Sequence, residues 1–294
     1  MKIGLQIPRF TWPGGDAAIA RTLADIAQTA DGVGFASVWV MDHFFQLEPM
    51  LGRAGEPMLE SYSALSYMAA LTRAVRLGTL VSGVIYRTPA LLVKAVTNLD
   101  VLSGGRAYCG VGAAWYDREA AGLGFPFPPT RERFELLEET LQLAHHMWAG
   151  RTEPFHSAHL SLAEPLCSPM PLSRPHPPIM IGGMGEKKTL RLVAQYADAC
   201  NLFARAGESV LREKLDILRR HCDELARPYE AIEKTTLGTV HLAPGQMSAA
   251  DVVEQCRGLA ALGISHAIFN MPNVHEIAPL ETFGREIIPA VAEL

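Results

Sequence analysis

Two ionisable residues, Asp42 and His43, follow directly on the apolar run Ser37 to Met41. That run has the length and character of a buried strand, so the pair would stand where a strand ends. A histidine in such a place can act as a general acid or base, hydrogen-bond a cofactor or ligate a metal. The structural alternative is an aspartate that caps the loop beside a histidine whose hydrogen bonds are satisfied.

A metal site is the weakest of these alternatives. Barrel hydrolases gather several histidine and carboxylate ligands at neighbouring strand ends, and no strand end here carries a His-x-His pair. His145 and His146 fall in a helical pattern and His156 and His159 in a proline-rich segment, so we interpret all four as solvent-exposed. The five cysteines lack the close pairing of a zinc site, which predicts reduced structural thiols and no metal.

A glycine-rich turn, Gly182 to Gly185, separates the apolar run at Ile179 from a helical pattern that opens at Glu186. Free backbone N–H groups and the positive end of the helix dipole make such a turn an anion site suited to a phosphate. The pattern is neither the dinucleotide fingerprint nor the ATP-binding loop, so the phosphate need not belong to either ligand.

Two further strand ends suit a bound ring. Ser82 and Gly83 interrupt an apolar run, which indicates a bulge or a close backbone approach to a ligand. The small residues 112–114 are followed by Trp115 and Tyr116, so a flat molecule could lie on the backbone beside aromatic walls. Packing at a barrel corner would explain the same residues without a ligand.

Eight short apolar runs alternate with helical patterns, which is typical of repeated βα units around a parallel sheet. The strands are predicted at Ile3 to Ile7, Ser37 to Met41, Arg76 to Val81, Ala107 to Val111, Ile179 to Gly182, Ala199 to Leu202, Leu237 to Leu242 and His266 to Asn270. Eight such units close into an α/β fold, the (β/α)8 or TIM barrel, whose active site forms at the C-terminal ends of the strands. We therefore predict a single domain over residues 1–294.

Residues 151–178 interrupt this rhythm with many prolines and no sustained period. Because a βα unit follows at once, we interpret the segment as an insertion between the fourth helix and the fifth strand. A lid over the barrel mouth and plain packing on the outside are equally good expectations.

Charge and hydropathy exclude several classes of partner. The formal net charge is -5 and both signs are mixed along the chain, so no basic stripe suits nucleic acid. No apolar run reaches membrane-spanning length, and the N-terminus lacks the features of a secretory signal. We expect a cytoplasmic enzyme that acts on a small molecule.

The order and spacing of these segments resemble the luciferase-like monooxygenase superfamily and, within it, the oxidoreductases that use the deazaflavin coenzyme F420. The similarity covers nearly the whole chain. It runs through Gly4 to Pro8, Ser37 to Phe44, Leu77 to Val84, Ser103 to Arg106, Gly110 to Trp115 and Pro178 to Gly183.

The resemblance implies a cofactor across the barrel mouth, with its ring against a third-strand bulge at Ser82-Gly83 that often holds a non-proline cis peptide. His43 is the implied catalytic acid or base, with Asp42 beside it. Trp115, Tyr116 and insertion residues would wall the substrate. The implied cofactor-binding residues are Asp42, His43, Ser82, Gly83, Gly112, Ala113, Ala114, Gly182, Gly183, Met184 and Gly185.

One departure from the family concerns the acid. Related sugar-phosphate dehydrogenases carry a carboxylate after the fourth-strand glycines, where this chain has Trp115, so activity on sugar phosphates is in doubt. Glu60 could supply a catalytic acid, and a helix-stabilising first-turn glutamate is an equally good interpretation.

Hydride transfer between F420 and a small organic substrate is the leading hypothesis. An FMN-dependent two-component monooxygenase of the bacterial luciferase type shares the ring shape and the phosphate loop. A non-catalytic flavin-binding barrel is a third possibility, against which the presence of Asp42 and His43 speaks. The resemblance also implies a homodimer.

Overall fold

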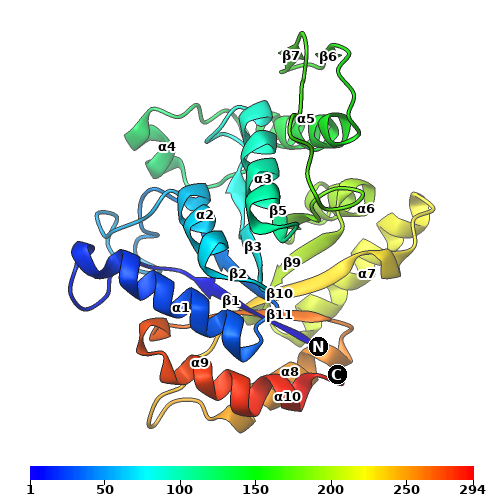
Figure 1. Ribbon diagram of the computed structural model, residues 1–294. Helices are drawn as coiled ribbons and strands as arrows, with labels where there is room; N and C mark the ends of the chain where they lie inside the picture. Colours follow the sequence, from blue (N-terminus) through cyan, green and yellow to red (C-terminus); the bar gives the residue numbers. More distant parts are fainter.

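Parallel strands form one continuous sheet in the computed structural model, which describes residues 1–294 (Figure 1). They are β1 (Lys2–Ile7), β2 (Ser37–Val40), β3 (Arg76–Thr79), β4 (Ser82–Gly83), β5 (Ala107–Gly112), β8 (Ile179–Gly182), β9 (Ala199–Phe203), β10 (Glu233–Thr239) and β11 (His266–Asn270). Their order is β3-β2-β1-β11-β10-β9-β8-β5-β4, and β3 also pairs with β5, so the sheet closes on itself. Because β3 and β4 are consecutive pieces of one barrel position, the predicted (β/α)8 barrel is confirmed.

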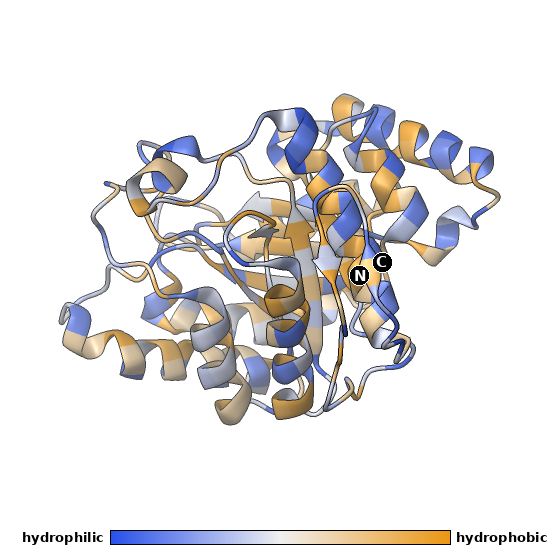
Figure 2. Cartoon of the chain, turned by 90° about the horizontal axis from the view of Figure 1, so that it is seen from above, coloured by the Kyte–Doolittle hydropathy of each residue, from blue (hydrophilic) through white to orange (hydrophobic).

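Helices surround the sheet and bury its outer face. They are α1 (Ile19–Val33), α2 (Ser61–Leu71), α3 (Pro89–Ser103), α4 (Asp117–Leu123), α5 (Thr130–Trp148), α6 (Thr189–Tyr196), α7 (Glu208–Glu224), α8 (Ala249–Ala261), α9 (Ala278–Thr282) and α10 (Ile288–Val291). Every residue of β2 and β5 is buried, as expected for parallel strands covered on both faces. Figure 2 shows hydrophobic residues on the central strands and mixed colours along the surrounding helices.

Local sequence signals fix several helix ends. Pro89 stands in the first turn of α3, and Gly104 ends it with a φ of 73°. Ser248 and Asp251 form a reciprocal capping box at the start of α8, with Ser248 N–H donating to Asp251 Oδ2 over 2.7 Å.

Several strand and helix boundaries differ from the prediction. β10 begins at Glu233 rather than Leu237, because threonines and Lys234 occupy its buried first half and hide the apolar pattern. β3 ends at Thr79, where a cis peptide between Leu80 and Val81 interrupts the strand. The helix expected from Glu186 starts later, at Thr189.

The insertion packs on the outside of the barrel. It carries a small antiparallel hairpin, β6 (Phe155–His156) with β7 (Ser161–Leu162), which lies beside α5 at the edge of the molecule (Figure 1). Asp100 of α3 accepts hydrogen bonds from Leu172 N–H at 2.7 Å and Ser173 N–H at 2.8 Å. No residue of the insertion lines the barrel mouth, so it is no lid and supplies no wall of the substrate pocket.

Of the four histidines that we expected to be solvent-exposed, His156 and His159 are exposed, and His145 and His146 are not. His146 is buried and lies 3.2 Å from the Glu153 carbonyl, and the rings of His145 and His176 are 4.9 Å apart. These side chains anchor the insertion to α5. No group of three or more histidine, cysteine or acidic side chains is placed to hold a metal ion, and all five cysteines are free and buried. None of the helices combines the length and the apolar character needed to cross a membrane.

Candidate active site

A cavity of about 940 Å³ opens at the C-terminal ends of the strands. This is the face on which enzymes of this fold build their active sites, because the βα loops converge there. Each strand position contributes to it, through Gln6, Met41, Ser82, Gly112, Gly182, Asn201, Thr239 and Asn270.

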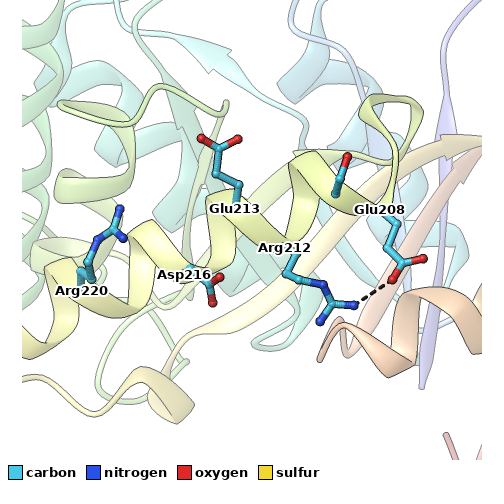
Figure 3. A pocket seen from close by; sticks show the side chains of 6 residues that line it. Glu208, Arg212, Glu213, Asp216 and Arg220 are labelled. Carbon is cyan, nitrogen blue, oxygen red and sulfur yellow. Dashed lines mark hydrogen bonds and ion pairs between the residues drawn. The ribbon is translucent and has the colours of Figure 1, made fainter.

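A second hollow, on the outer face of α7, has no apolar wall. Glu208, Arg212 and Arg220 are among the six polar or charged residues that line it, and Glu208 and Arg212 pair at 2.8 Å (Figure 3). Exposed charges of both signs on one helix are an ordinary solvated surface. We therefore take the barrel mouth as the functional site.

The interrupted third strand directs an apolar side chain into the mouth. Val81, next to the cis peptide, lines the cavity, whereas the buried Ser82 hydroxyl donates to Thr79 Oγ1 over 3.0 Å. A β-carbon on Gly112 or Gly182 would lie 3.0 Å from a Val81 methyl group. These glycines therefore make room for Val81, which lines the cavity together with Ser82 and Gly83, the two residues expected there.

His43 lies at the edge of the cavity and is held by a carboxylate. Its Nδ1 is 3.1 Å from Oε1 of Glu119, a fully buried residue of α4 whose Oε2 accepts the Phe45 N–H at 2.7 Å. Burial would raise the pKa of Glu119, but hydrogen bonds from His43 and Phe45 outweigh it and keep that pKa below its usual value. Because a carboxylate can only accept, Nδ1 carries the proton, and Nε2, which has no partner in the protein, is left for a ligand.

Aromatic rings surround His43. The ring of Trp115, 54% exposed, lies edge-on at 5.8 Å from the imidazole, and Tyr86 lies at 6.4 Å. Tyr116, expected in the pocket wall, is instead buried behind Trp115, with the rings stacked 5.2 Å apart. Tyr116 thus supports the pocket wall without forming it.

Two acidic residues proposed for catalysis lie outside the cavity. Asp42 is buried and accepts hydrogen bonds from Arg87 at 2.6 and 3.0 Å and from the Ser61 hydroxyl at 2.6 Å. Glu60 caps the first turn of α2 and also pairs with Arg87. Their oxygens are occupied in fixing α2 to the loop after β2, which corrects the expectation that they contact cofactor or substrate.

The glycine-rich turn after β8 offers backbone donors, although not at every position expected. Gly183, with a φ of 119°, lines the cavity, but its N–H donates to the Asn201 carbonyl over 3.1 Å. The N–H groups of residues 184–189, Met184, Gly185 and Thr189 among them, have no acceptor in the protein, and of these residues Thr189 lines the cavity. The start of α6 therefore has backbone donors available to an anion.

Small residues after β5 form a tight turn at the mouth. Ala113 and Ala114 both line the cavity, and Ala114 adopts a φ of 60°, an uncommon conformation for a residue with a side chain. Arg133 of α5 donates from Nε to the Ala113 carbonyl over 3.1 Å and so holds the turn in place. The backbone that we predicted to lie against a ligand is therefore held in a fixed position.

Several site residues escaped the sequence analysis. Gln6, Asn201 and Asn270 stand at the C-terminal halves of their strands, so the strand-end rule that pointed to His43 would have found them. Glu119 gave no such signal, because it lies within a helix and nothing in the spacing from His43 indicates a contact.

Three comparisons relate this architecture to known proteins. The family model of luciferase-like monooxygenases matches residues 1–287. The F420-dependent glucose-6-phosphate dehydrogenase of Kineococcus radiotolerans is 26% identical, over 91% of this chain and 92% of its own length.

The solved structures that are similar share the fold. An F420-dependent secondary alcohol dehydrogenase in complex with an F420-acetone adduct has a TM-score of 0.81 at 19% identity, covering 99% of this chain and 98% of that one. The EDTA monooxygenase of a Chelativorans species has a TM-score of 0.83 at 13% identity, covering 99% of this chain and 93% of that one. A dehydrogenase and a monooxygenase therefore have the same barrel.

Proposed function

The chain belongs to the luciferase-like monooxygenase family, and we propose that it transfers a hydride between coenzyme F420 and a small organic substrate. The observation that carries this proposal is the pair of His43 and Glu119 at the mouth of the barrel. An imidazole with one nitrogen fixed by a carboxylate and the other free is arranged to exchange a proton with a ligand. The F420-dependent enzymes among the relatives support the choice of cofactor.

The residues present suit such a cofactor. The free N–H groups of Met184, Gly185 and Thr189 would hold its phosphate, and Val81 would support one face of its ring. A cavity of about 940 Å³ has room for a ring and a small substrate together. When bound, reduced F420 supplies a hydride, because a carbon stands where flavin has the nitrogen that permits oxygen chemistry.

His43 would handle the proton that accompanies the hydride. As a substrate carbonyl becomes an alcohol, protonated His43 donates from Nε2 to the carbonyl oxygen, and in the opposite direction neutral Nε2 accepts the hydroxyl proton. Glu119 stabilises the imidazolium form and keeps the ring in one orientation.

The test is a binding titration with F420, FMN and FAD, followed by anaerobic oxidation of reduced F420 with a panel of ketones and enones. We expect F420 to bind most tightly and turnover to proceed without oxygen. Stronger FMN binding together with strict oxygen dependence would instead assign the chain to the two-component monooxygenases. Binding of cofactor without turnover of any substrate would favour a non-catalytic barrel.

We further propose a cytoplasmic homodimer. Support comes from exposed leucines on one side of the barrel, where Leu91 and Leu102 of α3 are 56% and 67% exposed and Leu166 and Leu172 of the insertion lie nearby. An apolar surface of this kind is typical of an interface between subunits. Light scattering at micromolar concentration should give twice the monomer mass of 32.0 kDa, and a monomer would contradict the proposal.

A further inference from the structure

We infer that the substrate is an uncharged molecule with a compact, largely apolar body, and that the site does not accept a sugar phosphate. The inference rests on the proposed function, since it names the substrate of the same site. It departs from the named substrate of the relatives, which are glucose-6-phosphate dehydrogenases.

The mouth of the barrel has two opposite sides. β2, which carries His43 at its end, and β9, which leads to Arg205, are separated by β1, β11 and β10 in one direction and by β3/β4, β5 and β8 in the other. The free N–H groups after β8 lie next to the β9 side, since β8 pairs with β9 and the Phe203 N–H lies 3.3 Å from Met184 Sδ. The groups that suit an anion are therefore gathered away from His43.

The side that holds His43 offers no cation to a substrate. Arg205 is the only lysine or arginine that lines the cavity, and it stands on the β9 side. Arg87 and Arg118 pair with carboxylates, Arg133 donates to backbone carbonyls, and Arg9 lies outside the lining. A phosphate monoester taken from water to this side would lose its hydration without a positive partner in return.

Apolar side chains take the place of such a partner. Met41, Leu47, Met50 and Leu51 follow β2 and line the cavity on the side of His43. Met50 is 52% exposed, and Trp115, which also lines the cavity beside His43, is 54% exposed. Covering these exposed apolar groups with a ligand is favourable, and flexible methionines adapt to ligands of different shape. A compact apolar molecule with a carbonyl or hydroxyl group at Nε2 of His43 fits these walls.

The experiment compares two substrates on the same F420-loaded enzyme under anaerobic conditions. Oxidation of reduced F420 by cyclohexanone and the reverse reaction with cyclohexanol represent the neutral class, and glucose 6-phosphate represents the sugar phosphates. We expect kcat/KM for cyclohexanol to exceed that for glucose 6-phosphate by about 100-fold. Glucose 6-phosphate as the better substrate, or turnover of no neutral ketone or alcohol in a wider panel, would overturn the inference.

Two aromatic variants locate the substrate within the mouth. Trp115→Ala should raise KM for cyclohexanone roughly tenfold and leave the Kd for F420 unchanged, because apolar contact is lost on the His43 side. Phe203→Ala is the matched control: its ring also lines the cavity but lies on the β9 side, so it should change F420 binding and not KM for cyclohexanone. The reverse pattern would overturn the inference.

Failure of the proposed function has a different signature. A protein that does not bind F420 in the direct titration refutes hydride transfer from that cofactor, and the substrate assignment falls with it. A protein that binds F420 and oxidises glucose 6-phosphate refutes the substrate assignment alone.

Discussion

The two ends of the barrel use the same kinds of side chain in opposite ways. At the N-terminal end, Glu233 accepts from Lys2 at 2.8 Å and from the Tyr108 hydroxyl at 2.7 Å, while His266 Nε2 lies 2.9 Å from the Ser37 hydroxyl. At the C-terminal end, the side chains of Gln6 and Asn270 and the Nε2 atom of His43 have no partner in the protein.

This difference separates stability from function within one sheet. Polar groups buried inside a barrel must be paired with one another, unless a ligand or water is to pair with them. At the N-terminal end Glu233 and His266 Nε2 are paired internally, and His266 Nδ1, which has no hydrogen bond, lies 3.6 Å from Glu233 Oε1, so those residues hold the strands in register. At the C-terminal end the pairing is left open, which is what a binding site requires.

The most direct test of this difference between the two ends is to remove one histidine from each. His43→Ala should slow hydride transfer by about 10²–10⁴-fold, the contribution of a positioned acid or base, and leave the melting temperature nearly unchanged. His266→Ala should do the opposite, because it leaves the Ser37 hydroxyl inside the barrel without its imidazole partner. Single-turnover kinetics and thermal unfolding of both variants measure the two effects.

A contrary result is easily recognised. If His43→Ala keeps the wild-type single-turnover rate, His43 does not supply the proton. If His266→Ala loses rate and keeps stability, the two ends have been assigned the wrong way round.

A smaller effect on the rate is expected from Glu119, the carboxylate that holds His43. Glu119→Gln keeps the shape of the side chain and removes the charge that stabilises imidazolium, so the rate should fall by about 10–100-fold. Glu139→Gln, which removes a similar contact with His159 on the outside of the barrel, is the matched control and should leave the rate unchanged. A Glu119→Gln variant with the wild-type rate would mean that the charge of Glu119 does not support His43.

Regular features of the fold could be predicted from the sequence, and pairings between distant side chains could not. His43 was found because a strand end is visible as the end of an apolar run. Asp42 was misplaced because its partner Arg87 lies 45 residues away. Glu119 was missed for the same reason, since 76 residues separate it from His43.

The polar first half of β10 shows a second limit. Apolar periodicity predicted that strand from Leu237, whereas it starts at Glu233. The interior of the barrel at this level is polar, with Asn201 Nδ2 donating to Thr235 Oγ1 over 2.8 Å. Hydropathy marks a strand only where its neighbours inside the barrel are apolar, and here they are not.

The contribution of the N-terminal end of the barrel to stability should depend on pH. Burial would raise the pKa of Glu233, but His266, Lys2 and Tyr108 together hold that pKa well below its ordinary value. A carboxyl group whose pKa is lower in the folded state stabilises the fold above its unfolded pKa of ~4.3, and the contribution is lost as the pH falls below that value. Glu233→Gln should therefore reduce the free energy of unfolding by about 1–2 kcal/mol at pH 7, and the difference from wild type should shrink toward pH 3. Urea unfolding at several pH values measures it, with Glu254→Gln, at the exposed pair with Arg257, as the control that should show no difference at any pH. A difference between Glu233→Gln and wild type that stays constant from pH 7 to pH 3 would mean that the charge of Glu233 contributes nothing to stability. The N-terminal end of the barrel would then be stabilised by packing alone.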